Sequence, residues 1–236
     1  MYWFKSPNIS ITHGFSTRLG GVSSHPFHSL NFGGGEDELS NIIENRKRAL
    51  NALDLVPEQT AYLKQIHSNN VLIAQPGSQT GDALVTKESG LALAIAAADC
   101  YPLLFHDPAN KIIGAAHAGW RGTVARIAKN TMDKMIELGA DASKIKVAIG
   151  PGISCKNFEV GPEVIEEFKQ AEFPDDCIIN KNIDLLRANK FVLIENGIAE
   201  ENIWAMNRCT FEDDFFSHRR DKGKTGRMWA VICLEP

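Results

Sequence analysis

The sequence lacks the features that mark membrane proteins and nucleic-acid-binding proteins. Its longest apolar run, Leu91 to Ala98, is far shorter than a membrane-spanning helix requires. Its formal net charge is −4 and its basic residues are dispersed apart from two short clusters, so it offers no extended basic stripe for a nucleic-acid backbone. We therefore expect neither a membrane nor a nucleic acid among its partners.

Cysteine is scarce and unpaired in this sequence. Five cysteines, an odd number without a CxxC spacing, do not fit a disulfide framework. The segment Met1 to Pro7 also lacks the basic, apolar and small-residue parts of a signal peptide. These features predict a cytoplasmic protein, in which a special cysteine acts as a thiolate ligand or as a nucleophile.

Repeats and low-complexity linkers are absent as well. The short glycine runs fit neither a Walker loop nor a dinucleotide fingerprint. What is present is an ordinary globular composition, 44% hydrophobic and 23% charged over 236 residues. We expect a single domain that covers residues 1–236.

Hydrophobic periodicity predicts more strands than helices. Strands are expected at Ile9–Ser16, Ala61–His67, Val71–Gln75, Asp82–Val85, Leu91–Ala98, Leu103–His106, Ile112–His117, Ile145–Ile149, Ile203–Met206 and Met228–Leu234. Helices are expected at Asn41–Leu53, Gly122–Leu138, Pro162–Gln170 and Ile183–Glu195. Because the two types interleave irregularly and short links imply hairpins, the pattern predicts an α/β or α+β fold with much antiparallel character.

Three predicted strands end in side chains that can do chemistry. An apolar run stops at Asp99 and Cys100, just before Pro102, which cannot continue a strand ladder. Two other strands end in His117 and His67. Taken singly, each residue is better explained as a packing or turn residue.

Taken together, His67, Cys100 and His117 indicate a metal site. One thiolate and two imidazoles form a borderline-soft donor set that matches zinc and leaves a fourth position for water or substrate. Copper is the less favoured alternative. Their spacing along the chain is not a known metal-binding pattern, so residue type alone carries this prediction.

Arginine supplies the second candidate group. Arg46 falls within the apolar face of the helix expected at Asn41–Leu53, where its guanidinium must reach solvent, meet a buried carboxylate or bind an anion. Arg121 precedes the next helix in the same way, so two inward arginines are expected to clamp a phosphate. Arg18 and Asn31 belong to polar, glycine-rich clusters that could line a pocket, although loop structure explains them too.

The remaining histidines receive a structural interpretation. His13, His25, His28 and His106 are expected to be surface or packing residues.

A set of motifs resembles the YfiH family, also called laccase-domain proteins or peptidoglycan editing factors. The matching motifs are Gly14-Phe-Ser-Thr-Arg-Leu-Gly-Gly-Val-Ser23, Glu44-Asn-Arg46, Gln65-Ile-His67, Ala98-Asp-Cys-Tyr-Pro102, His117-Ala-Gly-Trp-Arg-Gly122, Gly150-Pro-Gly-Ile153, Phe216-Ser-His-Arg-Arg220 and Thr225-Gly-Arg227. They run in the family's order from about Gly14 to Leu234.

The resemblance implies a layered α/β/β/α fold, similar to the catalytic domain of cytotoxic necrotizing factor. It implies a zinc ion on His67, Cys100 and His117, with Arg46 as the candidate phosphate contact. For proton transfer we expect either Asp99 or a metal-bound water. Members of the family resemble purine nucleoside phosphorylases that split adenosine, inosine or methylthioadenosine with phosphate and also deaminate adenosine. The expected partners are thus a small nucleoside and phosphate, for a monomer or weak homo-oligomer.

This sequence departs from the family pattern at Phe158 and His218, which both stand where tyrosine is usual. A hydroxyl role in orienting substrate is therefore in doubt. An alternative enzyme uses Cys100 as nucleophile and His117 as base to edit an amide in a peptidoglycan precursor. A copper polyphenol oxidase is disfavoured, because seven histidines without a His-x-His pair are too few for several copper centres. A binding module without turnover is the remaining alternative.

Overall fold

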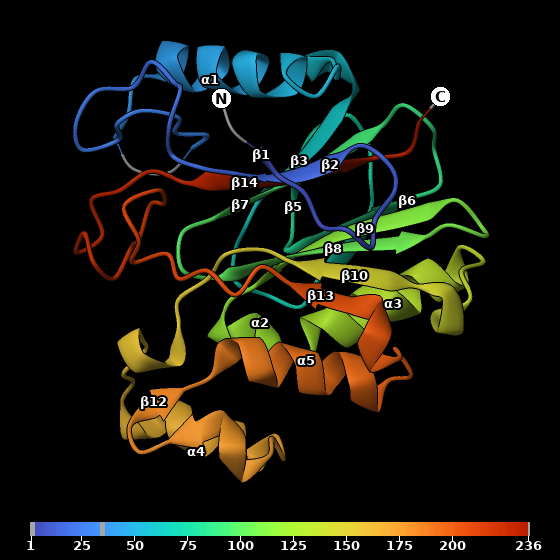
Figure 1. Cartoon of the computed structure of the whole chain (residues 1–236), viewed down its shortest axis with the longest axis vertical. Helices are drawn as coiled ribbons and strands as arrows, with labels where there is room; N and C mark the ends of the chain where they lie inside the picture. The colour runs from blue at the N-terminus through green and yellow to red at the C-terminus, as the bar shows by residue number, and fades with distance from the viewer. Residues whose placement is uncertain (1–2, 34–35, 236) are drawn as a thin grey trace.

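Two six-stranded sheets packed face to face form the centre of the molecule, and helices cover both outer faces (Figure 1). The computed structural model describes residues 3–33 and 36–235. The first sheet has the order β1-β2-β14-β7-β3-β5, formed by Trp3–Phe4, His13–Ser16, Met228–Cys233, Ala92–Ala97, Thr60–Lys64 and Gly77–Thr80. The second has the order β13-β10-β8-β9-β6-β4, formed by Ile203–Ala205, Lys146–Ile149, Tyr101–Asp107, Ile112–Ala118, Ala83–Thr86 and Val71–Ile73.

The helices complete a four-layer arrangement. They are α1 (Leu39–Asn51), α2 (Trp120–Val124), α3 (Ile127–Glu137), α4 (Pro162–Gln170) and α5 (Leu185–Glu195), and a small two-stranded ribbon, β11 (Ile178–Ile179) and β12 (Asn182–Ile183), lies near α4. In Figure 1, α1 lies outside the first sheet and α2, α3 and α5 lie outside the second. No helix in the described part of the chain is long and apolar enough to cross a membrane.

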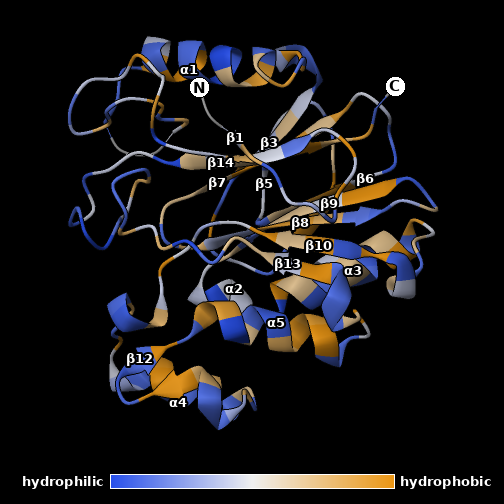
Figure 2. Cartoon of the chain, in the orientation of Figure 1, coloured by the Kyte–Doolittle hydropathy of each residue, from blue (hydrophilic) through white to orange (hydrophobic). Residues whose placement is uncertain are grey.

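The main core lies between the two sheets. Leu93 and Ile95 of β7 meet Leu104 of β8 and Ile113 of β9 there, all fully buried. Because these central strands are covered on both faces, they are apolar along most of their length. Figure 2 shows how strands and surface helices differ in hydropathy, since β6 is strongly hydrophobic and α1 is mainly hydrophilic. The sheets therefore form a rigid support for side chains at strand ends.

The predicted fold class is confirmed, since the molecule has α/β/β/α layers and mixed sheets. Antiparallel pairs such as β8 with β9 stand beside parallel pairs such as β3 with β7. Two of the predicted helices also agree closely with α4 and α5. The second of these begins where the Asp184 carboxylate accepts a hydrogen bond from the Arg187 amide, and it ends before Gly197 at φ +95°.

The single helix predicted over Gly122–Leu138 is wrong, because the structure has α2 and α3 with a break between them. Arg126 lies at the break with φ +61°. Its guanidinium donates to the Ala171 carbonyl and lies 4.2 Å from the Phe173 ring centroid. Tertiary contacts thus favour a left-handed residue where local periodicity favours a continuous helix.

Several strand boundaries also differ from the prediction. The strand expected to run to His67 ends at Lys64, and the one expected from Ile9 begins at His13. Pro102 lies inside β8, near its start, where a missing amide is tolerated. The strand Gly77–Thr80 was not predicted, because its polar residues lack an apolar alternation. Gly34 and Gly35 of the predicted glycine-rich cluster lie outside the described residues.

Candidate metal and substrate site

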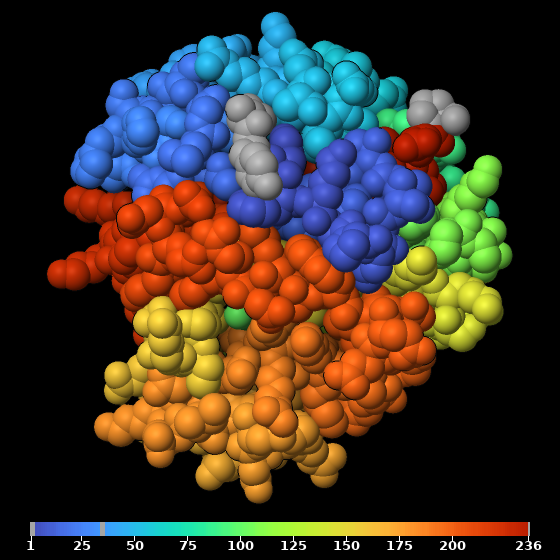
Figure 3. Space-filling view, in the orientation of Figure 1, coloured from blue at the N-terminus to red at the C-terminus, as the bar shows by residue number. Residues whose placement is uncertain are grey.

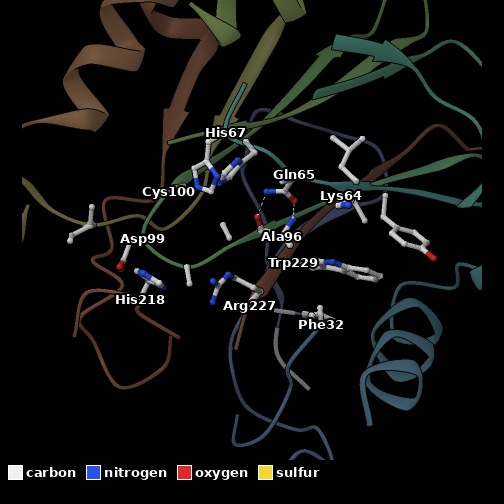
Figure 4. Close-up of a pocket in the computed structure, with 18 of the residues that line it drawn as sticks. Phe32, Lys64, Gln65, His67, Ala96, Asp99, Cys100, His218, Arg227 and Trp229 are labelled. Carbon is white, nitrogen blue, oxygen red and sulfur yellow. Dashed lines mark hydrogen bonds between the residues drawn. The ribbon is translucent and has the colours of Figure 1, made fainter. Parts of the chain in front are cut away.

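A cavity of about 640 Å³ opens where strands of the two sheets end (Figure 4). Its floor is formed by small side chains of β7, chiefly Ala94 and Ala96. At one end lie His67 and Cys100 (Figure 4), and the His117 ring is next to them, with its centroid 4.9 Å from that of His67. At the other end lie aromatic and guanidinium groups, so the cavity has two chemically different ends, here called the metal end and the arginine end.

Strand pairing brings the three predicted metal donors together. His117 of β9 pairs with Pro102 of β8, which places it beside Cys100, the residue directly before that strand. His67 reaches the same point from the end of β3. The candidate ligand atoms of His67, Cys100 and His117 lie within 4.8 Å of one another. This geometry fits a common transition-metal ion, because all three donors face the cavity and leave one side open.

A buried carboxylate that was not predicted to be functional holds both histidines. Asp82 has no exposed surface, and its Oδ1 lies 2.9 Å from Nδ1 of His117. This contact leaves Nε2 of His117 free to face Cys100. A carboxylate bound to the second nitrogen of a metal-ligating histidine is a recurrent feature of metal sites. Asp82 therefore fixes the orientation of His117.

The same carboxylate shapes the loop that carries His67. The amides of His67 and Ser68 donate to Asp82 at 3.0 and 2.6 Å, and the hydroxyl of Ser68 donates at 2.7 Å. His67 itself has φ +58°, a left-handed conformation that costs free energy in a residue with a β-carbon. Several hydrogen bonds to one buried acceptor stabilise that conformation.

Gly119 allows the donors to approach closely. A β-carbon at this position would lie 2.8 Å from Sγ of Cys100 and 3.2 Å from Cδ2 of His67. Both distances are shorter than ordinary van der Waals contact. Glycine at position 119 is thus required by packing against two metal donors.

Charge within the metal end favours the thiolate form of Cys100. Burial by itself would raise the pKa of this thiol, but the charge of His117 and hydrogen bonds from both histidines outweigh it and lower the pKa to about 6. Burial would lower the pKa of His117, yet Cys100 and Asp82 raise it to about 9. Burial would also raise the pKa of Asp82, but hydrogen bonds from His117 and Ser68 lower it to about 2. A thiolate is the form in which cysteine binds a metal.

The arginine end is built from stacked side chains. The Arg46 guanidinium lies 4.5 Å from the Tyr62 ring centroid and 5.3 Å from that of Trp229. Phe32 stacks on Trp229 with ring centroids 4.7 Å apart. Arg227 projects into the middle of the cavity between these rings and the metal end (Figure 4). Of the three fates predicted for Arg46, the structure excludes a carboxylate partner among the described residues, because no ion pair includes it.

Asp99 lines the cavity beside Cys100, at φ +84°. Its Oδ1 accepts a hydrogen bond from the Thr210 hydroxyl at 2.6 Å, and its Oδ2 accepts one from the Arg219 amide at 2.7 Å. These contacts fasten the segment before β14 to the cavity. Figure 3 shows this orange-red segment as a band across the middle of the molecule's face. Asp99 therefore has a clear structural role, beside the proton-transfer role that was predicted for it.

The other predicted substrate contacts are placed differently from expectation. Arg121 is exposed at the rim and stacks 4.3 Å from the Trp120 ring centroid, so the prediction that it faces the interior is wrong. Arg18 does not line the cavity; its Nε donates to the His28 carbonyl. Asn31 is fully buried and also lies behind the cavity wall. Of these, only Arg121 keeps access to the cavity.

Several residues of the site were missed by the sequence analysis. Asp82 opens a strand instead of ending one, and only its position beside Gly81 at a predicted turn could have drawn attention to it. Arg227 and Trp229 belong to motifs and strands that were recognised without a function. His218 was noted only as a departure from the family pattern, yet it lines the cavity near Asp99 (Figure 4).

The chain is similar to known proteins over nearly its whole length. Residues 12–235 match the family model described as multi-copper polyphenol oxidoreductase laccase. A purine nucleoside phosphorylase of Deinococcus radiodurans is 44% identical over 234 residues, which cover 98% of this chain and 92% of that protein. The purine nucleoside phosphorylase YfiH of Escherichia coli is 36% identical over 228 residues, 93% of this chain and 92% of that protein.

A solved structure agrees with these relationships. The crystal structure of YlmD from Geobacillus stearothermophilus superposes with a TM-score of 0.91 at 32% identity, covering 98% of this chain and 94% of that one. Both the family model and the relatives extend across the two sheets and the cavity. The chain therefore belongs to the YfiH family of laccase-domain proteins, and the resemblance drawn from its motifs is confirmed.

Proposed function

We propose that the protein is a zinc-dependent purine nucleoside phosphorylase that splits adenosine, inosine and methylthioadenosine with phosphate and also deaminates adenosine. One observation carries the proposal: a single cavity combines a His–Cys–His donor set with two arginines, Arg46 and Arg227, that form no ion pair with described residues. The names of the relatives support the same reaction class.

In the proposed phosphorolysis, an oxygen of HPO₄²⁻ forms a bond to the anomeric carbon of ribose. The bond from that carbon to the purine nitrogen breaks, and its electron pair leaves with the purine. The proton lost by the phosphate is matched by the one that the purine takes up. Arg46 would bind the phosphate, and Asp99 would accept and return the proton. Each Asp99 oxygen accepts one hydrogen bond from the described residues and retains a lone pair.

The metal end would contribute in a second way. Zinc bound by His67, Cys100 and His117 would supply Lewis acidity, which polarises a substrate oxygen or lowers the pKa of water. The donor set fits zinc, since it offers a thiolate and two imidazoles with an open fourth side. Deamination of adenosine consumes one water and releases inosine and ammonia, so it requires no phosphate.

The alternatives use fewer of these features. A Cys100–His117 pair acting as nucleophile and base would leave the third donor, His67, without a function. A multi-copper oxidase needs several copper centres, and the described residues contain one group of three metal-competent donors. The single-domain organisation, the cytoplasmic location and the monomeric or weakly oligomeric state stay predictions.

The direct test incubates the purified, zinc-loaded protein with adenosine, with and without phosphate, and separates the products by chromatography. We expect adenine and ribose 1-phosphate when phosphate is present, and inosine when it is absent. Cys100→Ala is expected to lose both reactions, whereas Cys155→Ala, outside the cavity, keeps them. Release of neither adenine nor inosine by the native protein would contradict the proposal.

A further inference from the structure

Arg227 is a cavity arginine whose hydrogen-bonding capacity is largely unused. Its NH1 donates to the carbonyls of Thr225 and Gly226, at 3.1 and 2.9 Å. Within residues 3–33 and 36–235, no acceptor bonds its Nε or NH2, and no carboxylate forms an ion pair with it. Figure 4 shows the side chain pointing into the cavity. The part of the guanidinium fork that faces the cavity is therefore available to a ligand.

The dipeptide Asn31-Phe32 forms hydrogen bonds with both Arg227 and Arg46. The Phe32 carbonyl accepts hydrogen bonds from Nε and NH2 of Arg46, at 3.0 and 2.8 Å. The Phe32 amide donates to the Arg227 carbonyl at 3.1 Å, and Oδ1 of Asn31 accepts from the Arg227 amide at 2.9 Å. The two arginines, distant in sequence, are thus anchored to residues 31 and 32. Asn31, predicted to contact substrate, instead fixes the backbone of Arg227.

A cation in this position carries an unfavourable desolvation free energy unless an anion joins it. Burial lowers the pKa of Arg227, while the nearest negative charges, Cys100 and Asp99, act on it only from a distance. Arg46 is partly stabilised by stacking on two aromatic rings, but no ring of the described residues lies over Arg227. In the described part of the chain, NH1 makes both side-chain hydrogen bonds of Arg227 to protein, so a purely structural role would need NH1 alone.

We propose that Arg227 is a second phosphate-binding residue, which together with Arg46 holds the attacking phosphate between the metal end and the aromatic rings. This inference rests on the proposed phosphorylase function. Two guanidinium groups match the charge of HPO₄²⁻, and the free edge of a planar fork suits two phosphate oxygens at once. Arg121 and Arg219 do not serve this purpose, because both are exposed at the rim.

The test compares Arg227→Gln with Arg48→Gln, a matched loss of one positive charge at an exposed position of α1 outside the cavity. Titration calorimetry with inorganic phosphate alone measures binding, and initial rates at varied phosphate measure KM. We expect Arg227→Gln to raise both the Kd and the KM for phosphate by about 10- to 100-fold, the loss of one or two charge-assisted hydrogen bonds. The KM for adenosine in the phosphate-free deamination should change by less than about 3-fold, since that reaction uses no phosphate.

Arg227→Lys is a second variant that keeps the charge and removes the fork. We expect Arg227→Lys to raise the KM for phosphate less than Arg227→Gln does, and to leave the KM for adenosine in the phosphate-free deamination unchanged. If Arg227→Gln fails to fold, the phosphate Kd and KM of Arg227→Lys still show whether Arg227 binds phosphate. Unchanged phosphate Kd and KM in the folded Arg227 variants, or an equal loss in Arg48→Gln, would overturn the inference.

The binding measurement also separates this inference from the proposed function. Phosphate that binds the native protein in an Arg227-dependent manner, without any phosphorolysis, would support the anion site and refute the phosphorylase. Phosphorolysis that proceeds with an unchanged phosphate KM after Arg227→Gln would refute the anion site and leave the phosphorylase intact.

Discussion

The two ends of the cavity are held in place by different means. At the metal end, one buried carboxylate, Asp82, binds His117 directly and fixes the backbone at His67. At the arginine end, Arg46 and Arg227 are held by backbone carbonyls and by stacking. The metal end therefore depends on one acceptor that serves several donors, whereas the arginine end distributes its contacts over several groups.

This difference predicts two kinds of response to substitution. Loss of one group at the metal end should affect all three donors together, because Asp82 and strand pairing connect them. Loss of one group at the arginine end should weaken anion binding by degrees and leave metal binding alone. The predictions below test that division, beginning with the largest expected effect.

Removal of the thiolate should abolish metal binding and activity together. We expect Cys100→Ala to hold little or no zinc after dialysis and to lose at least about 1,000-fold in the rate of both reactions, because two imidazoles alone form an incomplete site. Metal analysis by mass spectrometry and product assays check this result. Full zinc content in this variant, with Cys155→Ala as control, would show that the metal lies elsewhere.

Substitution of the shared carboxylate should weaken the metal end without removing a donor. Asp82→Asn places an amide NH₂ among donors that need an acceptor, so we expect zinc affinity to fall by about 10- to 100-fold. Competition with a chelator measures the affinity, and Asp133→Asn on the exposed face of α3 is the control. An unchanged affinity would mean that Asp82 only stabilises the loop.

At the arginine end, Arg46→Lys should give a graded effect. The charge remains, but both hydrogen bonds to Phe32 and the planar stack on Tyr62 are lost. We expect the KM for phosphate to rise by roughly 10-fold and zinc content to stay unchanged. Lys47→Gln, the neighbouring cation, serves as control. Zinc loss in Arg46→Lys would contradict the independence of the two ends.

The smallest effect concerns pH and the core that supports both ends. Burial lowers the pKa of His106 from 6.5 to about 4; Asp107 acts in the opposite direction, and Lys146 and His13 lower the pKa further. The Nδ1 atom of His106 has no hydrogen-bond partner among the described residues. The unfolded chain thus binds the proton first as pH falls. The free energy of unfolding should have its full value above about pH 6.5 and should decline as the pH falls towards 4, with about 1–2 kcal/mol lost by pH 5.

Urea unfolding of the metal-free protein at pH 7 and pH 5 measures this decline, and His106→Gln removes the histidine's share of it. If native protein and variant show the same pH dependence, His106 does not titrate as the structure indicates.

Sequence reasoning identified the metal end better than the arginine end for a physical reason. Cys100 and His117 each follow an apolar run, and a polar group where such a run stops is visible without knowledge of the fold. His67 stands at the end of a predicted strand. The cavity position of Arg227 depends on β14 pairing with β7, a contact between distant segments that periodicity does not reveal. Arg46 was found only because it interrupts an apolar helix face.

The fold class was predictable because strands buried on both faces differ from amphipathic helices in their periodicity. The predicted element boundaries were wrong where a side chain takes over the hydrogen bonds that a strand backbone would make. Gln65 exchanges hydrogen bonds with both the amide and the carbonyl of Ala96, at 2.8 and 2.7 Å, as a strand residue would (Figure 4). This contact ends β3 early and releases the chain toward His67. The break at Arg126 has the same character, since both depend on tertiary contacts.

The most direct test of the account is the position of the metal, measured by anomalous scattering above and below the zinc absorption edge in crystals of the native protein. The account predicts one zinc peak about 2.0–2.3 Å from Sγ of Cys100 and from ring nitrogens of His67 and His117, with its open side toward Arg227. A peak bound elsewhere, or a zinc-replete crystal in which these three side chains carry no metal, would contradict it.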